Sequence, residues 1–354
     1  MSMQPAIDGT EREGSRALAS RATAAGWFAV SLVLTLLGLI LVTFLIARVV
    51  PIDPVLVMVG DRATPEAYEQ ARRSMGLDNP LYWQFLEYVG SVAIGDLGQS
   101  VMTGREVLAD TMRAFPATLE LALAATLIGS LLGVPAGVLA AVRRGRLSDH
   151  VVRLVSLIGY SLPVFWLGLV ALLVFYARLG WVAGPGRIDI AYQYSVPAMT
   201  GFVMLDALLA GEWAAAGNAL SHLILPASIL GYVSMAFIAR MTRSLMIEQL
   251  SQEYVLAARA KGLPARTVIW RHAFGNVLVQ VITVITLTFA YLLEGAVLTE
   301  TVFAWPGLGL YITQALFSAD LNAVLGGTLV IGVCFVLINR GVELLYRIFD
   351  PRIR

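Results

Sequence analysis

The run LVSLIGYSLPVFWLGLVALLVFYA, residues 154–177, decides the fold class, because it contains no charged side chain. About 20 apolar residues in a helix cross the roughly 30 Å hydrocarbon core of a bilayer. The rest of the chain agrees, since 58% of its 354 residues are hydrophobic and only 14% are charged. Ordinary soluble domains carry about 25% charged residues. The sequence therefore predicts an all-α integral membrane protein and not a large soluble helical one.

Five further apolar runs are long enough to cross a membrane. A polar stretch with Arg12, Arg16 and Arg21 precedes the first run, which is longer than the apolar part of an ordinary signal peptide. We therefore expect the first run to remain as an anchor, after a disordered tail at residues 1–26. The six predicted transmembrane helices are residues 27–49, 117–142, 154–177, 220–239, 273–299 and 321–339.

The distribution of Lys and Arg predicts the orientation of the six spans. Most of these residues lie near the termini or in the loops that follow the second and fourth spans. Short loops rich in Lys and Arg stay in the cytoplasm, so both termini are predicted to be cytoplasmic. The loop at residues 50–116 then lies outside, and we expect it to fold. It is acidic and carries aromatic residues, which fits either a cap resting on the membrane or a docking surface for an extracytoplasmic partner.

The segment SQEYVLAARAKG, residues 251–262, has the signals of a short helix in the loop between the fourth and fifth spans. Ser251 is a suitable N-cap. Glu253 in the first turn and Lys261 in the last turn both complement the helix dipole. Gly262 suits the left-handed position that ends a helix. The segment is too short and too polar to span a membrane.

One face of this short helix is small and mildly apolar, which suits a groove in a partner protein. The alternative is a helix lying on the anionic leaflet, but such helices carry bulky apolar residues, and this one carries alanines. The residues on that face are Leu250, Tyr254, Ala257, Ala258 and Lys261.

Several classes of function are excluded or disfavoured by the composition. Lys261 is the only lysine and is followed by Gly262, so the chain has no P-loop for ATP. Cys334 is the only cysteine, and the three histidines have no metal-binding spacing, so we expect no metal site and no enzyme activity. A net charge of +1 gives no reason to expect nucleic-acid binding.

Two carboxylates interrupt the apolar runs and are functional candidates, because charged groups are costly in a membrane. Glu120 and Glu294 both lie near the predicted outer ends of their spans, where they could line a pore or cap an interface. Pro163, Pro226 and Pro306 are expected to break or kink their helices, which neighbouring spans can tolerate around a cavity.

The stretch EYVLAARAKGL at 253–263, followed by HAFGN at 272–276, resembles the EAA-type loop of ABC importer permeases, in particular the dipeptide, oligopeptide and nickel branch. The strict motif begins with an acid where this chain has Ala257. Other stretches that resemble this branch, in the same order, are GDLGQS (95–100), PATLEL (116–121), SLPVF (161–165), ETVFAWPGLG (300–309) and DPR (350–352).

The resemblance implies a type I ABC importer permease fold and a set of partners. These are a second homologous permease, two ATPase subunits that bind ATP and Mg²⁺, an extracytoplasmic solute-binding protein and the lipids of a bacterial inner membrane. It implies no cofactor in this chain. The coupling helix at about 252–262 would contact an ATPase through Glu253, Tyr254, Ala257, Ala258, Lys261 and Gly262.

The resemblance also implies roles at the outer side. Glu300 joins Glu120 and Glu294 as candidates for the pore or its outer mouth, and Asp96, Gln99 and Ser100 become candidates for docking the binding protein. The expected divisions are a tail at 1–26, a first span at 27–49, a loop subdomain at 50–116, a permease core at 117–346 and a tail at 347–354.

Di- and oligopeptides are the expected substrates, and nickel, glutathione or another small solute is the alternative for the same machinery. A stand-alone secondary transporter is the alternative class, although its usual inverted repeats are not evident. An integral membrane enzyme would need clustered His, Asp or Ser near one interface, which the sequence does not show.

Overall fold

The computed structural model describes residues 26–27, 29–46, 53–60, 63–74 and 76–349. Within these ranges the chain is helical, and its only β contact is an isolated bridge between Gln99 and Glu106. The predicted all-α class is confirmed. The predicted tail at 1–26, apart from Gly26, and the DPR stretch at 350–352 lie outside the described residues.

The chain divides into two compact units, Met1–Gly95 and Asp96–Arg354. In the first unit, Asp53 caps a short helix by accepting hydrogen bonds from the amides of Val55 (2.9 Å) and Leu56 (3.4 Å). The Tyr68 hydroxyl donates to the same carboxylate at 2.7 Å, and this bond is the main reason that the pKa of Asp53 is lowered. The helices of this unit are Ala29–Ile46, α2 (Pro54–Val59), α3 (Pro65–Ser74) and α4 (Leu81–Ala93).

The second unit contains the other predicted spans. Its longer helices are α5 (Val107–Val142), α6 (Leu147–Ser161), α7 (Val164–Ala171) continued by η1 (Leu172–Arg178), α10 (Trp213–Leu250), α13 (Gly275–Gly295) and α16 (Leu321–Phe349). Its shorter ones are α8 (Ile190–Gln193), α9 (Val203–Leu209), α11 (Glu253–Ala260), α12 (Ala265–Thr267), η2 (Val268–Phe274), α14 (Val297–Val302) and α15 (Leu308–Phe317).

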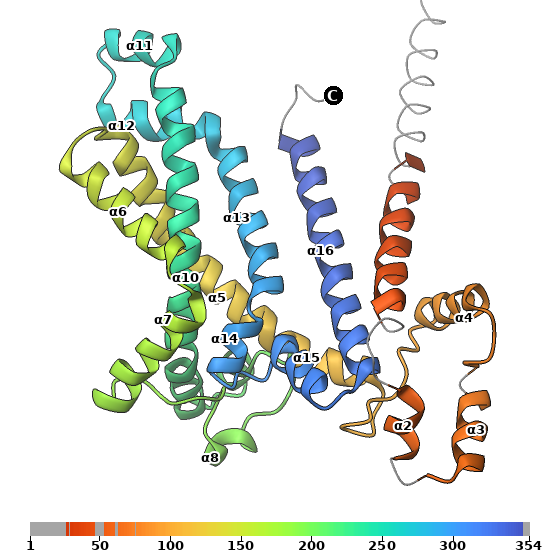
Figure 1. Ribbon diagram of the computed structural model, residues 1–354. Coiled ribbons are helices and arrows are strands. Elements are labelled where there is room, and N and C mark those ends of the chain that lie inside the picture. The colour runs from red at the N-terminus through yellow and green to blue at the C-terminus, as the bar shows by residue number, and fades with distance from the viewer. Residues whose placement is uncertain (1–25, 28, 47–52, 61–62, 75, 350–354) are drawn as a thin grey trace, which may run out of the picture. The chain divides into compact units, whose positions relative to one another are not determined.

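Five described helices are long and apolar enough to cross a membrane, and the bent pair of α6 with α7 and η1 adds a sixth crossing when it is counted as one span. An apolar helix or bent helix pair thus lies at each of the six predicted spans, although the bounds differ at both ends. In Figure 1, α11 lies at one end of the second unit and α8 lies at the other, with α15 nearer to α8. We call these the α11 end and the α15 end.

A stripe of glycines brings α5 and α10 into close parallel contact. A Cβ added at Gly129 would lie 2.5 Å from Ser234 Cβ, and one added at Gly137 would lie 2.6 Å from the Ala239 carbonyl oxygen. Gly133, halfway between them, lies against Met235 and Ile238. Small residues spaced four apart allow membrane helices to approach this closely, so this pair forms the rigid centre of the second unit.

The third crossing is broken at Ser161-Leu162-Pro163, where its two halves meet at 98°. Leu162 has extended backbone angles (φ −89°, ψ 136°), as expected for a residue before proline. The expectation for Pro163 is thus confirmed. Pro226 differs, because α10 continues through it from Trp213 to Leu250.

The fifth predicted span ends earlier than expected, and a helical hairpin follows it. The apolar helix ends at Glu294, and α14 and α15 are joined by a turn in which Ala304 has a φ of +46°. Pro306 lies in this turn. The buried Trp305 ring packs into the main core beside Ala117 and Leu121 of α5, which fixes the hairpin at the α15 end.

Candidate functional site

The helix α11 is displayed on a loop at the α11 end of the second unit (Figure 1). Glu253, Tyr254, Ala257 and Lys261 all have exposed side chains. Leu256, which was not among the residues predicted from the sequence, is also exposed over 56% of its surface. This surface combines apolar and charged groups, which suits contact with a protein partner.

The end of α11 has the geometry that its glycine predicts. Gly262 has a φ of +74°, and its amide donates to the Arg259 carbonyl oxygen at 2.9 Å. The next amide, that of Leu263, donates to Ala258 O at 3.3 Å. Left-handed backbone is readily available only to glycine, so a side chain at 262 strains the turn although nothing lies within 4 Å of its position.

Two details of the predicted coupling helix are wrong. Ser251 does not cap α11, because its hydroxyl donates back to the Glu248 carbonyl oxygen at 2.7 Å; Gln252 occupies the N-cap position without a side-chain bond. Ala258 does not belong to the exposed face, because its side chain is buried against the rest of the chain. Ala257 and Ala258 are adjacent and of the same size, so the sequence does not show which of them points inward.

The inward face of α11 connects it to the long helices. Val255 and Ala258 join a buried cluster with Met246 of α10, Val138 of α5 and Val268 of η2. Close-packed side chains are nearly incompressible and transmit strain to their neighbours. A displacement of α11 would therefore be transmitted directly to α5 and α10.

An ion pair ties the neighbouring loop to the same helices. Asp149 in the first turn of α6 accepts from Arg243 of α10 through both carboxylate oxygens, at 2.6 and 2.9 Å, and from the Gly145 amide at 2.9 Å. Such bidentate pairs fix geometry as well as charge. Neither residue was predicted from the sequence, although an acid in a strongly basic loop is a usable signal.

The bend at Pro163 opens a hollow of about 560 Å³ between α6, α7, α10 and α13. Its lining has aromatic rings and hydroxyl groups and contains no Asp, Glu, Lys or Arg. Side chains that characterise it are Tyr160, Phe165, Ser234, Phe237, Thr288 and Tyr291. An uncharged wall with scattered hydroxyls can pass a polar solute without holding it tightly, as conduction requires.

Glu300 lies at the centre of the α14–α15 hairpin and is fully buried. The Thr118 hydroxyl donates to Glu300 Oε1 at 2.6 Å, and the Leu310 amide donates to Oε2 at 3.0 Å. Burial raises the pKa of Glu300, while Thr118 and the amides of Leu310 and Gly309 oppose that rise. These contacts make Glu300 the internal brace of the hairpin.

Glu120 is paired within the chain. Arg187, from the segment before α8, donates to Glu120 Oε2 through Nε (2.9 Å) and Nη2 (2.5 Å), and also to the Gly201 carbonyl oxygen at 2.7 Å. The Met204 amide donates to the other carboxylate oxygen at 3.2 Å. The pair pins the 178–212 segment onto α5. Arg187 was not foreseen, because sequence alone does not show which loop basic residue folds back.

The segment between η1 and α10 is held together by hydrogen bonds to a buried carboxylate. Asp206 is buried and accepts from the Thr200 hydroxyl at 2.6 Å and from the amides of Thr200, Gly201 and Met199 at 2.8–3.2 Å. Burial works to raise the pKa of Asp206, but these hydrogen bonds outweigh it and hold the pKa below its usual value.

Apart from Gly95, the GDLGQS segment belongs to the second compact unit, whose first residue, Asp96, lies within the predicted loop at 50–116. Ser100 has 1% of its surface exposed, and its hydroxyl donates to Asp320 at 2.6 Å, just before α16. The Asn322 amide nitrogen donates to the Gln99 carbonyl oxygen at 3.0 Å. Asp96 and Gln99 have exposed side chains, and Ser100 faces inward.

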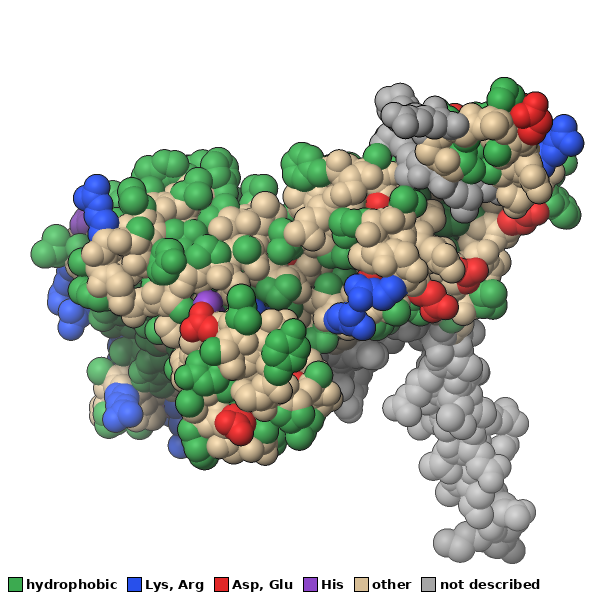
Figure 2. Space-filling model, turned by 90° about the horizontal axis from the view of Figure 1, so that it is seen from below, with side chains coloured by type: hydrophobic (Ala, Val, Ile, Leu, Met, Phe, Trp, Pro, Cys, Tyr) green, Lys and Arg blue, Asp and Glu red, His purple; other side chains and the backbone are tan. Residues whose placement is uncertain are grey.

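The remaining candidate, Glu294, has an exposed side chain near the end of α13. On the face seen in Figure 2, which looks at the α15 end, charged side chains are few and scattered over a hydrophobic and uncharged surface. No group of three or more His, Cys, Asp or Glu in the described ranges could hold a metal ion.

Comparisons with known proteins give a consistent result. The family described as "Binding-protein-dependent transport system inner membrane component" matches residues 133–354, and the N-terminal part of such membrane components matches residues 28–122. The chain is 46% identical to the "Di/tripeptide transport system permease protein DppB" of Pseudomonas aeruginosa, over 91% of this chain and 96% of that protein.

Two further relatives are from Escherichia coli. The "Probable D,D-dipeptide transport system permease protein DdpB" is 46% identical, over 91% of this chain and 94% of its own length. The "Dipeptide transport system permease protein DppB" is 41% identical, over 90% of this chain and 95% of its own length.

Proposed function

Because the chain belongs to the family of binding-protein-dependent transport inner membrane components, we propose that it forms half of the pore through which di- and tripeptides enter the cell. ATP hydrolysis on partner subunits drives the import, and an extracytoplasmic binding protein delivers the peptide. The substrate class follows the names of its relatives, which are peptide permeases. This chain carries no catalytic residue for the hydrolysis.

The α11 end faces the cytoplasm in this proposal. The short loops at that end carry exposed Arg143, Arg144, Arg146, Arg259 and Arg266, and short loops rich in basic residues are retained on the cytoplasmic side. Both termini then lie in the cytoplasm, and the α15 end faces outward.

The single observation that carries the coupling role is the two-sided character of α11. Its exposed side presents Tyr254, Leu256 and Lys261, and its buried side locks Val255 and Ala258 onto α5 and α10. An ATPase that binds the exposed side and moves would therefore displace the two central helices. Glu253, Ala257 and Gly262 complete the contact surface.

The hollow at the bend of the third crossing is the part of the translocation path that this chain contributes. A second, homologous permease faces it and closes the path. A broken span is tolerated in a membrane where it lines a cavity, and the uncharged lining allows a peptide to pass without a permanent ion pair.

The outer contacts follow from what is exposed at the α15 end. Asp96 and Gln99 remain candidates for docking the binding protein, whereas Ser100 supports them by bonding to Asp320. Glu120 and Glu300 brace the outer mouth through Arg187 and Thr118, and Glu294 has the exposure that a pore-lining role needs.

Uptake of a labelled dipeptide tests this proposal, using vesicles that contain the whole complex and its binding protein. We expect uptake that requires ATP and the ATPase subunits, and no uptake with a non-hydrolysable ATP analogue. Uptake driven by an ion gradient without ATP would indicate a stand-alone transporter and overturn the proposal. ATP-driven uptake of nickel or glutathione but not of dipeptides would support the importer mechanism and rule out peptides as its substrates.

A further inference from the structure

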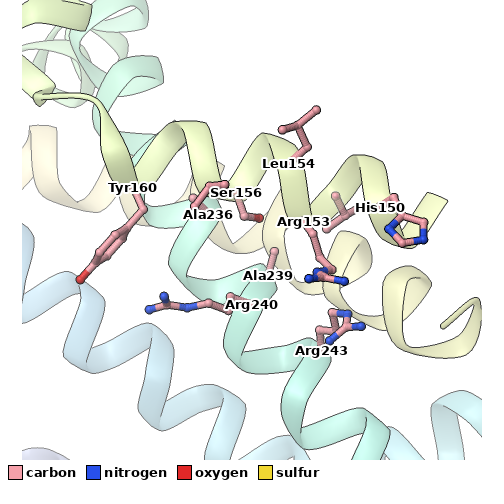
Figure 3. A pocket seen from close by; sticks show the side chains of 11 residues that line it. His150, Arg153, Leu154, Ser156, Tyr160, Ala236, Ala239, Arg240 and Arg243 are labelled. Atoms are coloured by element: carbon pink, nitrogen blue, oxygen red, sulfur yellow. The ribbon is translucent and has the colours of Figure 1, made fainter. Parts of the chain in front are cut away.

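A second cavity, of about 410 Å³, lies between α6 and α10 on the α11 side of the hollow. Tyr160 lines both spaces, so the two are neighbours at this residue. Figure 3 shows three arginines around this cavity, Arg153 from α6 and Arg240 and Arg243 from α10. The hollow has no charged lining residue, whereas its neighbour is strongly cationic.

Within the described residues, only one of the three guanidinium groups has a carboxylate partner. Arg243 is paired with Asp149, and the charge of Arg153 also acts on that carboxylate. Neither Arg153 nor Arg240 lies within 4.0 Å of a carboxylate oxygen in the described part of the chain. Three positive charges against one negative charge leave two uncompensated, beside His150 and an apolar wall.

Arg240 is positioned at the junction of the two spaces. Its guanidinium carbon lies 4.9 Å from the centre of the Tyr160 ring and 5.5 Å from that of Phe237. Both rings also line the hollow. Val233, Phe237 and Arg240 are spaced four and three residues apart, so they share one face of α10, and this face runs from the hollow into the cationic cavity.

We propose that Arg240 and Arg153 bind the terminal carboxylate of the peptide as it leaves the hollow toward the α11 end. This inference rests on the proposed import of peptides. A free peptide carries a carboxylate at neutral pH, and the planar guanidinium group matches a carboxylate through two parallel hydrogen bonds. Both arginines have exposed side chains, so water competes for them and the peptide is released and not trapped.

The stacking of Arg240 adds a second consequence. A guanidinium held over aromatic rings is pre-oriented, and engagement by a carboxylate draws it away from Tyr160. The same side chain can thus close the junction when the path is empty and bind the peptide when it passes. Arg240→Lys keeps the charge but loses the planar fork, whereas Arg240→Gln loses both.

The charge of this cavity can be measured in the intact complex from the rates at which charged thiol reagents modify a cysteine placed in it. Cys334 is the only cysteine, so Leu157→Cys in a Cys334→Ser background places one thiol beside the arginines. Leu157 lines the cavity and is 63% exposed. Ile158→Cys is the matched control, because Ile158 lies next to it on α6, is 43% exposed and does not line the cavity.

The quantity to measure is the rate of modification by an anionic methanethiosulfonate divided by the rate with a cationic one. We expect this ratio to be about tenfold higher for Leu157→Cys than for Ile158→Cys. Arg240→Gln and Arg153→Gln should each reduce that preference, and Arg240→Lys should retain it. A dipeptide should slow modification of Leu157→Cys, whereas the same dipeptide with a C-terminal amide should not. With Arg240→Lys, the dipeptide should protect less.

Equal protection by the peptide and its amide, or no protection by either, would overturn the inference. Protection that depends on anionic phospholipid in the vesicles and not on peptide would also overturn it, and would assign the cavity to a lipid phosphate. Uptake is measured on the same vesicles with ATP. A complex that imports the dipeptide but shows no protection rejects this inference alone, whereas a complex that imports no dipeptide rejects the proposed function.

Discussion

The two ends of the second unit differ in the burial of their charged side chains. At the α15 end, the carboxylates of Glu120, Glu300, Asp206 and Asp320 are all buried and accept hydrogen bonds from the chain itself. At the α11 end, most Lys and Arg side chains are exposed, and α11 directs Tyr254, Leu256 and Lys261 outward. Most buried acids thus brace the α15 end, whereas at the α11 end only Asp149 among the described acids is buried, and most cationic groups are open to a partner.

This difference separates residues that hold the molecule together from residues that connect it to others. Removing the partner of a buried carboxylate costs much stability, because the charge is then left buried without compensation. An exposed side chain contributes little to folding, so the effect of replacing it shows in a partner-dependent activity. Substitutions at the two ends should therefore change different observables.

The largest loss of stability is expected for Arg187→Met. This change leaves the Glu120 carboxylate buried without the guanidinium group that donates two hydrogen bonds to its Oε2 atom, which costs about 3–5 kcal/mol of unfolding free energy. The measurement is thermal unfolding of the purified complex. The double variant Arg187→Met/Glu120→Gln should recover at least half of the loss, since no charge is then buried alone. A double variant no more stable than the single one would contradict the role of this pair.

A smaller loss is expected for Glu300→Ala. It removes the acceptor for the Thr118 hydroxyl and the Leu310 amide, at a cost of about 2–3 kcal/mol. The cost of burying the Glu300 charge disappears with it, which is why this effect ranks below the previous one. Glu300→Gln, which keeps the shape and one acceptor oxygen, should lose less than half as much. Equal losses would show that the contacts of Glu300 do not brace the hairpin.

The smallest of these effects, for Asp206→Asn, depends on pH. The folded state holds the pKa of Asp206 below its usual value, so the carboxylate stabilises the fold above the unfolded pKa of about 3.9 and loses that contribution as the pH falls through the folded pKa. At pH 7 we expect the variant to be about 1–2 kcal/mol less stable. The difference from wild type should narrow between about pH 5 and pH 3. A difference that stays constant over this range would contradict a charged Asp206.

Much of the fold could be predicted from the sequence, because membrane crossing depends on local composition. The six apolar runs, the helix near 253–262, the left-handed Gly262 and the break at Pro163 each follow from residues adjacent in the chain. Helix lengths were underestimated, since α5 and α10 extend past their apolar parts into polar turns. Pro226 did not break α10, which packs closely along α5 on both sides of it.

The site was predictable where it is local and not where it depends on contacts between distant segments. The pairs Glu120–Arg187, Ser100–Asp320 and Thr118–Glu300 join residues 67, 220 and 182 positions apart, and no periodicity in one segment indicates such a partner. The inward orientation of Ala258 likewise depends on Met246 and Val268. The candidate pore acids and docking residues could be chosen by type, but their burial could not be foreseen.

The substitution Gly262→Trp tests whether α11 couples the pore to the ATPase. The matched control is Gly145→Trp, because Gly145 has the same left-handed backbone (φ +77°), has nothing within 4 Å of its Cβ position and lies in another loop at the α11 end. The measurement is ATP-driven dipeptide uptake by assembled complexes. We expect Gly262→Trp to assemble yet lose uptake by at least about tenfold, as disruption of a well-packed contact in a protein interface would produce. Gly145→Trp should retain uptake. Normal uptake by Gly262→Trp, or equal losses in the two variants, would contradict the claim.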